Sequence, residues 1–310
     1  MTRSVTVRVP AKVNVQLAVG GLRPDGFHDL ANVFLAVGLY DEVTATPADD
    51  LRITVSGTDA GGVPLDRGNL AARAALALAE RHGVQPRVHL HIAKDIPVAG
   101  GMAGGSADAA GALVACDALW GTAAPRAELL EICAELGSDV PFSLVGGAAL
   151  GRGRGELLTP LETGSTFHWA FAVAEGGLST PAVYRECDRL RAADGQGATV
   201  DDVPDPEPSP ALLEALRTGD AAALAAAVTN DLQPAALSLR PALADTLRAG
   251  TDAGALAALV SGSGPTCAFL AKDAEEAAAV AKALAASGTC RAVRVATGPA
   301  AGAAVVRSEG

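Results

Sequence analysis

The chain is poor in aromatic side chains, in basic charge and in long apolar runs. Phe, Trp and Tyr make up 3% of its 310 residues, and 35 Asp and Glu outnumber 24 Lys and Arg, for a net charge of −11. Such an acidic protein is ill suited to non-specific binding of nucleic acid, although a single pocket on it can still be positive. No apolar run reaches the roughly 18 residues that cross a bilayer. We therefore predict neither nucleic acid nor membrane among its partners.

Cysteine is scarce as well. The five cysteines are odd in number and include no Cys-x-x-Cys pair, so the common zinc and redox motifs are missing. We expect reduced, mostly buried thiols, with no metal site and no disulfide framework. The first residues lead directly into an alternating apolar pattern and show no secretory signal. These features predict a cytoplasmic protein.

The length and the order of apolar patterns predict two domains, at residues 1–155 and 156–310. A run of alternating Gly and Arg at 151–155 marks the predicted boundary. The first domain is expected to be mixed α/β. Its predicted strands are 5–19, 33–39, 51–55 and 88–92, and a bend is expected at Pro10 within the first of them. Its predicted helices are 69–81, 107–120, 126–136 and a short one from about 138.

The second domain is predicted to be a ferredoxin-like, split-βαβ unit. The expected order is strand, helix, two strands, helix, strand, with extra helices in the middle. The segments are a strand at 167–174, a helix at 183–192, a Pro-rich loop at 193–210, helices at 211–228 (broken near Gly219) and 241–250, strands at 256–260 and 266–270, a helix at 274–286 and a strand at 291–296.

Residues 97–110 are the most informative segment. An alternating strand leads into a loop with four glycines in six residues, and an Ala-rich helix follows. Strand, glycine loop and helix together bind phosphate, because exposed N–H groups and the helix N-terminus attract an anion. The segment is neither a Walker P-loop nor the dinucleotide motif Gly-x-Gly-x-x-Gly. A plain strand-to-helix turn is the alternative, but it does not need this many glycines.

Other polar residues allow a functional and a structural interpretation. Lys12, Asn14 and Gln16 share one strand face, which suits either a substrate groove or a solvated surface. Asp139 begins a short helix, as a cap or as a base near phosphate. Lys94 faces either solvent or the nucleotide. His89 and His91 alternate on a strand without a third metal ligand candidate.

Five segments, taken together, resemble a known family. The glycine loop is similar to the ATP loop of the GHMP small-molecule kinases, named for galacto-, homoserine, mevalonate and phosphomevalonate kinases. The other four narrow the resemblance to those GHMP kinases that act on a cytidine diphosphate-linked methylerythritol, and the run Arg-x-Asp-Gly-(Tyr/Phe)-His is the most discriminating of them. In order along the chain they are Pro10–Asn14, Gly21–His28, Leu136–Phe142 and Ser261–Thr266.

The resemblance implies a two-domain kinase that uses ATP and Mg²⁺ to phosphorylate a 2-hydroxyl in the non-mevalonate isoprenoid precursor pathway. It places catalysis on Lys12 and Asp139, and substrate binding on Asn14, Phe27, His28, Thr180 and Tyr184. Asn69 and Lys94 would lie by the adenosine. The remaining ATP-binding residues would be Pro97, Val98, Ala99, Gly100, Gly101, Met102, Ala103, Gly104, Gly105, Ser106 and Asp108.

Four positions depart from the family pattern. Phe27 replaces the usual Tyr, and Met102 replaces Leu. Ala103 replaces Gly, where a left-handed backbone would be costly. Ala107 replaces a second Ser, which leaves Ser106 as the only hydroxyl at this point of the loop. Two alternatives remain: another GHMP kinase, for mevalonate, homoserine or a sugar, and a non-catalytic nucleotide sensor. The sequence does not predict an oligomeric state.

Overall fold

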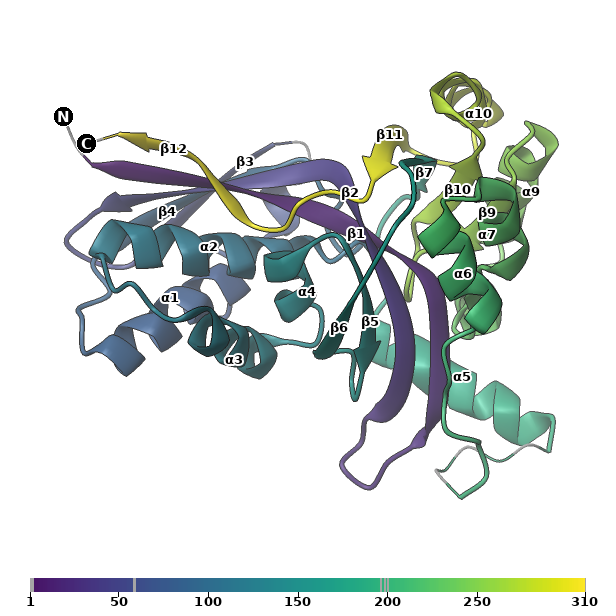
Figure 1. Cartoon of the computed structure of the whole chain (residues 1–310), viewed down its shortest axis with the longest axis horizontal. Coiled ribbons are helices and arrows are strands. Elements are labelled where there is room, and N and C mark those ends of the chain that lie inside the picture. The colour runs from purple at the N-terminus through teal and green to yellow at the C-terminus, as the bar shows by residue number, and fades with distance from the viewer. Residues whose placement is uncertain (1–2, 58–59, 196, 198, 200, 310) are drawn as a thin grey trace.

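The computed structural model describes residues 3–57, 60–195, 197, 199 and 201–309. Two β-sheets lie beside each other, and helices cover each of them (Figure 1). The α+β class and the two-part architecture agree with the prediction. None of the helices in the described residues is long and apolar enough to span a membrane.

A long antiparallel hairpin, β1 (Ser4–Leu22) and β2 (His28–Pro47), runs through the molecule. The alternate valines of β1 are buried, as the period of two predicts. The pairing shifts register at Pro10, where a bend was predicted. Strand β2 extends well beyond the predicted 33–39, because its flanking residues are also buried and paired.

The first sheet has the order β12-β1-β2-β4-β3, with β5 on β2, β6 on β5 and β8 on β1. One side of it carries the helices α1–α4 (Figure 1). Strands β5, β6, β8 and β12 were not predicted. The other elements of this part are β3 (Arg52–Gly57), β4 (Val88–Lys94), β5 (Ala148–Arg152), β6 (Leu157–Leu161), β8 (Thr229–Asn230), β12 (Ala304–Glu309), the 3₁₀ turn η1 (Ala60–Gly62), α1 (Leu70–His82), α2 (Gly104–Trp120), α3 (Arg126–Leu136) and α4 (Val140–Val145).

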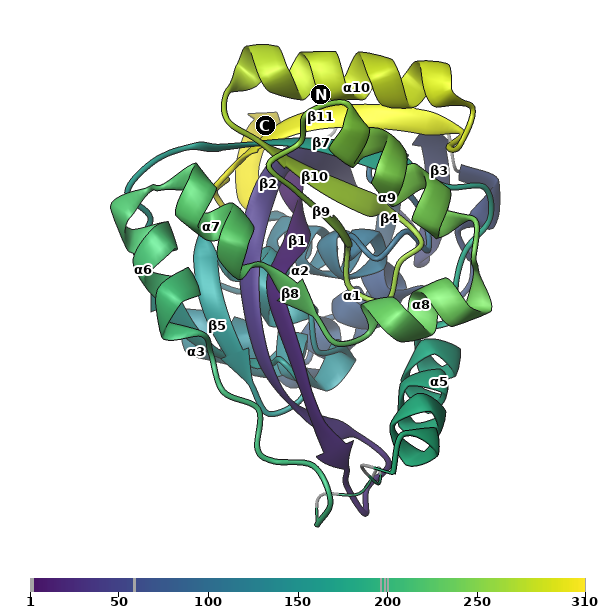
Figure 2. The same cartoon turned by 90° about the vertical axis from the view of Figure 1, so that its right-hand side faces the viewer.

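The second sheet is antiparallel with the order β11-β7-β10-β9. Its first and third strands are central, which is the arrangement of a split-βαβ unit and confirms the predicted fold class. Helices α9 and α10 cover its outer side (Figure 2). Its elements are β7 (Phe167–Val173), β9 (Ala257–Val260), β10 (Cys267–Ala271), β11 (Ala292–Gly298), α5 (Thr180–Ala193), α9 (Leu243–Asp252) and α10 (Ala274–Ser287).

Three further helices connect the two sheets: α6 (Pro210–Thr218), α7 (Ala221–Ala227) and α8 (Gln233–Leu239). The predicted break at Gly219 separates α6 from α7, and Gly219 adopts φ 74° there. The predicted loop at 193–210 precedes α6, although residues 196, 198 and 200 lie outside the described residues. The domain division at residue 155 stays a prediction; β6 and β12, which lie beyond it, pair with the first sheet.

Candidate active site

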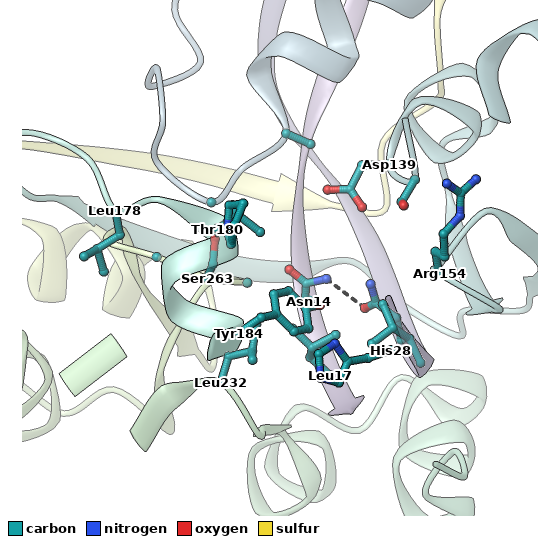
Figure 3. A pocket seen from close by; sticks show the side chains of 18 of the residues that line it. Asn14, Leu17, His28, Asp139, Arg154, Leu178, Thr180, Tyr184, Leu232 and Ser263 are labelled. Carbon is teal, nitrogen blue, oxygen red and sulfur yellow. Dashed lines mark hydrogen bonds between the residues drawn. The ribbon is translucent and has the colours of Figure 1, made fainter. Parts of the chain in front are cut away.

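A cavity of about 810 Å³ lies between the glycine loop, the β1–β2 hairpin, the start of α4 and helix α5. Asp139 and Arg154 lie on one wall, and Thr180, Ser263 and Tyr184 lie on the opposite wall (Figure 3). The cavity gathers most of the predicted site residues from separate parts of the chain. Those that line it are Lys12, Asn14, Phe27, His28, Ala99, Gly100, Gly101, Ala103, Gly104, Gly105, Ser106, Asp139, Thr180 and Tyr184.

Lys12 is almost fully buried at the centre of this arrangement. Its Nζ donates to Asn14 Oδ1 at 2.6 Å and to the Gly101 carbonyl at 2.9 Å, and it lies 3.7 Å from Asp139 Oδ2. Burial lowers the pKa of Lys12, and Asp139 opposes only part of that effect. The lysine therefore lies between the glycine loop and the Asp139 carboxylate and contacts both.

Asp139 precedes α4, but its side chain makes no capping hydrogen bond within the described chain. Its backbone carbonyl accepts from the Ser143 amide instead. About a third of the side chain is exposed, and it points into the cavity beside Lys12 (Figure 3). Of the two interpretations of the sequence, a side-chain cap and a carboxylate at the site, the structure favours the second.

The glycine loop presents backbone donors to the cavity. The amides of Gly104, Gly105 and Ser106, in the first turn of α2, have no acceptor among the described residues, and α2 has no side-chain cap. Uncapped donors at a helix N-terminus form an anion site. Ala103 adopts φ 62°, so the left-handed backbone persists although glycine is replaced, at a cost of about 1–2 kcal/mol.

A turn of the second part of the chain holds the loop in place. Ser261 Oγ donates to the Gly101 carbonyl at 3.1 Å, and the Thr266 amide donates to the Gly100 carbonyl at 3.2 Å. Gly101 adopts φ 76°, and a Cβ there would lie 2.1 Å from the Ser261 carbonyl oxygen. The segment Ser261–Thr266 therefore supports the glycine loop as well as turning the chain, and only glycine fits at residue 101.

Lys94 and Asp108 lie behind the loop and do not line the cavity. Lys94 Nζ donates to Asp41 at 2.5 Å and to Asp108 at 2.8 Å, and Asp41 also accepts from the amides of Asp95 and Ile96. Burial tends to lower the pKa of Lys94, but the two carboxylates outweigh it and raise that pKa. Burial raises the pKa of Asp108 against the attraction of Lys94. This cluster fixes the strand entering the loop to the helix leaving it.

Four other residues predicted at the ATP site also lie outside the cavity lining. Asn69 caps α1, since its Oδ1 accepts from the Ala71 amide at 2.8 Å. Met102 is fully buried, and its carbonyl accepts from the Lys12 amide at 3.3 Å. Pro97 and Val98 begin the loop. Direct contact of these residues with ATP stays a prediction.

The far end of the cavity is aromatic. Phe27 is 47% exposed, so it is not a core residue, and the Arg154 guanidinium lies 5.0 Å from the centre of its ring. The His28 and Tyr184 rings are 5.0 Å apart and inclined by 31°. His28 Nε2 lies 2.9 Å from Asp188 Oδ1, and burial raises the pKa of Tyr184. The Phe27 ring and the His28–Tyr184 ring pair therefore line the same end of the cavity.

Several residues of the site were not predicted from the sequence. Asp188 follows Tyr184 by four residues, which places both on one face of α5, so helical spacing was a usable signal. Arg154 was noted only as part of a boundary. Asn32 lies inside an apolar run of the sequence, so no local pattern marks it as a site residue. Gln16, expected in a polar row, turns instead to the backbone of residues 207 and 209 and does not line the cavity.

His89 and His91 bond to hydroxyl groups on β3. Thr54 Oγ1 lies 2.7 Å from His89 Nε2 and 2.9 Å from His91 Nδ1, and Ser56 Oγ lies 3.0 Å from His91 Nε2. Within the described residues no group of three or more His, Cys, Asp or Glu side chains is placed to hold a metal ion.

The family models and the sequence relatives place this fold and cavity in a class of small-molecule kinases, and the chain belongs to the GHMP kinases. The family models for the GHMP kinases N terminal domain and the GHMP kinases C terminal match residues 69–147 and 212–290. A 4-diphosphocytidyl-2-C-methyl-D-erythritol kinase of Streptomyces avermitilis is 77% identical over 303 residues, which cover 98% of this chain and all of that protein. The protein of that name in Thermobifida fusca is 59% identical, with 98% of each chain covered.

Solved structures agree with the sequence relatives. A crystal structure of 4-(cytidine 5'-diphospho)-2C-methyl-D-erythritol kinase has a TM-score of 0.75 at 32% identity and covers 95% of this chain and 99% of its own. A homoserine kinase from Cytophaga hutchinsonii has a TM-score of 0.74 at 21% identity, covering 98% of this chain and 97% of its own. That second likeness shows the fold alone.

Proposed function

We propose that this chain transfers the γ-phosphoryl group of ATP to the 2-hydroxyl of 4-diphosphocytidyl-2-C-methyl-D-erythritol, a step toward isoprenoid precursors. The relatives named above support the substrate. The observation that carries the mechanism is the position of the pair Lys12 and Asp139. It lies in one cavity between the uncapped start of α2 and the aromatic surface around Phe27.

The nucleotide would bind at the glycine loop. The amides of Gly104, Gly105 and Ser106 would donate to its phosphates, assisted by the α2 N-terminus. The Ser106 hydroxyl lines the cavity and is an oxygen donor of the kind that Mg²⁺ accepts together with phosphate oxygens. When bound, Mg²⁺ would neutralise charge on the phosphates.

The reacting hydroxyl would lie beside Asp139. Its carboxylate would accept the hydroxyl proton or orient it, and Lys12 would stabilise the negative charge that develops in transfer. Phosphoryl transfer requires alignment and charge neutralisation more than covalent help from the protein. Two of the three N–H donors of Lys12 are already used by Asn14 and Gly101, so the ammonium is held in place before the substrates arrive.

The cytidine would bind at the aromatic end. Phe27 would stack on the base, with Tyr184 on the far side and His28 at its polar edge. Base stacking contributes about 1–3 kcal/mol in nucleic-acid readers. Thr180, whose Oγ1 lies 2.9 Å from Ser263 Oγ, would contact the methylerythritol end. The free cysteines, four of them buried, support the proposal of a cytoplasmic location.

An assay of ADP release with purified protein tests the proposal. The panel of acceptors contains 4-diphosphocytidyl-2-C-methyl-D-erythritol, methylerythritol, mevalonate, homoserine and a sugar. We expect turnover of the cytidylyl compound alone, with the 2-phosphate identified by ³¹P NMR. Equal turnover of methylerythritol, or preference for another alcohol, would move the chain to a different specificity within the GHMP kinases. Nucleotide binding without turnover of any acceptor would indicate a sensor.

A further inference from the structure

A chain of side-chain hydrogen bonds runs from the ATP loop into the substrate cavity. Lys12 Nζ donates to the Gly101 carbonyl and to Asn14 Oδ1, and Asn14 Nδ2 donates to Asn32 Oδ1 at 2.7 Å. The last of these bonds is the dashed line that leaves Asn14 in Figure 3. All three residues come from the β1–β2 hairpin and are at most 4% exposed. The unassigned member of the chain is Asn32.

Chemistry fixes the orientation of both amides. A lysine ammonium only donates, so the atom of Asn14 that it contacts is the oxygen. The Asn14 amide nitrogen therefore faces Asn32 and requires an acceptor there. Asn32 must in turn present its oxygen to Asn14, which directs its own nitrogen to the other side. The direction of each amide follows from Lys12, although amide oxygen and nitrogen are otherwise hard to tell apart.

The Asn32 nitrogen is an unused donor at the cavity. Asn32 lines the cavity and is 3% exposed, and its Nδ2 has no hydrogen-bond partner among the residues that the structure describes. Its backbone pairs with both β1 and β5, so the side chain is mounted on a rigid central strand. Nδ2 is not among the fully buried side-chain atoms that lack a partner in the described residues, so it reaches the open cavity. A ligand that excluded water from this amide without accepting its hydrogen bond would lose about 1–3 kcal/mol. The position therefore favours a ligand with a hydrogen-bond acceptor at this point.

We propose that Asn32 is a substrate-binding residue whose Nδ2 donates to an anionic oxygen of the alcohol substrate, while its Oδ1 positions Asn14 and, through it, Lys12. Three cationic residues line the same cavity and would attract such an anion: Lys12, Arg154 and Arg185. One side chain would thereby link recognition of the substrate to the placement of the lysine at the reacting group.

The position of Asn32 along β2 indicates which part of the substrate its Nδ2 would contact. Asn32 follows His28 by four residues on the same strand face, so the two lie roughly 13 Å apart along β2. Its oxygen contacts Asn14, which holds Lys12 at the other end of the cavity. The segment between the aromatic end and the reacting hydroxyl is the diphosphate bridge, if the proposed function holds. Its oxygens are acceptors only, which matches a lone donor.

Two substitutions separate the two roles. Asn32→Asp keeps an acceptor for Asn14 but removes the donor and faces the diphosphate with a negative charge. We expect KM for the cytidylyl substrate to rise about 10- to 100-fold, with kcat within about threefold of wild type. Asn32→Leu removes donor and acceptor together, so kcat should fall as well, because Asn14 no longer holds Lys12 in place. The KM for ATP should change little in Asn32→Asp.

Gln16→Glu is the matched control, because it makes the same change at a buried amide of β1 that bonds to backbone outside the cavity. It should lower the melting temperature without a selective change in KM. Unchanged KM in Asn32→Asp while wild type remains active would overturn this inference alone. Equal losses of kcat in both Asn32 variants at unchanged KM would also overturn it and make Asn32 purely structural. Wild-type protein that phosphorylates only alcohols without a diphosphate would overturn this inference and the proposed function together.

Discussion

The two ends of the cavity differ in construction. At the proposed ATP end the cavity presents backbone amides, and the buried cluster of Lys94, Asp41 and Asp108 holds the loop from behind. At the proposed substrate end the cavity presents side chains, with Phe27 on a short turn and 47% exposed. A rigid backbone cradle suits phosphates, which all nucleotides share, whereas an exposed ring suits a particular base. The common chemistry and the specificity are thus separated in space.

The largest effect is expected between the two ends, at Asp139. Asp139→Asn should lower kcat by about 10²–10⁴-fold, because an amide cannot accept the hydroxyl proton. The side chain does not cap α4, so stability and ATP binding should remain near wild type. Steady-state kinetics and a melting curve check this. If the variant keeps more than about a tenth of wild-type kcat, Asp139 takes no part in proton transfer.

At the substrate end, Phe27→Ala should raise KM for the cytidylyl substrate about 5- to 150-fold, through loss of stacking on the base. The KM for ATP should stay the same, because the proposed ATP site lies at the other end of the cavity. The exposed ring makes little contribution to the core, so the melting temperature should hardly move. A fall in melting temperature of roughly 8 °C without a selective rise in KM would instead show that Phe27 is a structural residue. The two ends of the cavity would then differ less than the comparison above states.

The pH dependence of kcat should report Lys12. Burial lowers the pKa of its ammonium, so the proton is lost at a pH below 10.5, the ordinary value for lysine. In the proposed mechanism the protonated lysine is the active form, so kcat should fall as pH rises through that lowered pKa. Lys12→Arg stays protonated, and its residual activity should lack this alkaline limb. A wild-type profile that is flat up to pH 10.5 would contradict the assignment.

The burial of Lys12 also makes the free energy of unfolding depend on pH, and the direction of that dependence can be measured. Because its pKa is lower in the folded state than in the unfolded chain, the folded protein binds fewer protons between the two values. This contribution to the free energy of unfolding therefore rises as pH increases through that interval. Comparing wild type with Lys12→Met by urea unfolding at several pH values should show that rise in wild type only.

The smallest effect is expected in the loop. Ala103 adopts φ 62°, and Ala103→Gly relieves about 1–2 kcal/mol of backbone strain, while the added freedom of the unfolded chain costs about 0.4–1 kcal/mol. The two changes oppose each other, so the melting temperature should shift by no more than roughly 2 °C. Thermal unfolding checks this. A large loss of ATP affinity in this variant would contradict a preformed left-handed loop, since glycine adopts that backbone freely.

The same contrast explains what the sequence could predict. The glycine loop is a contiguous segment, so its local pattern is sufficient to identify it. Asp41 contacts Lys94 across 53 positions, and no local signal joins them. The substrate end assembles from three distant segments: the turn at Phe27, the segment of Arg154, and helix α5 with Thr180 and Asp188. The resemblance therefore located some of its residues, and local spacing was not used to locate the others. Strand β12 returns to the first sheet through an Ala-rich sequence that lacks a clear alternating pattern.

Calorimetric titration of wild type, Gly101→Ala and Phe27→Ala with two ligands tests the separation most directly. The ligands are a non-hydrolysable ATP analogue and 4-diphosphocytidyl-2-C-methyl-D-erythritol. In Gly101→Ala the new Cβ would clash with the Ser261 carbonyl, so a folded variant should lose about tenfold or more in nucleotide affinity alone. Phe27→Ala should lose affinity for the cytidylyl ligand alone. Equal losses for both ligands in either folded variant would contradict the account.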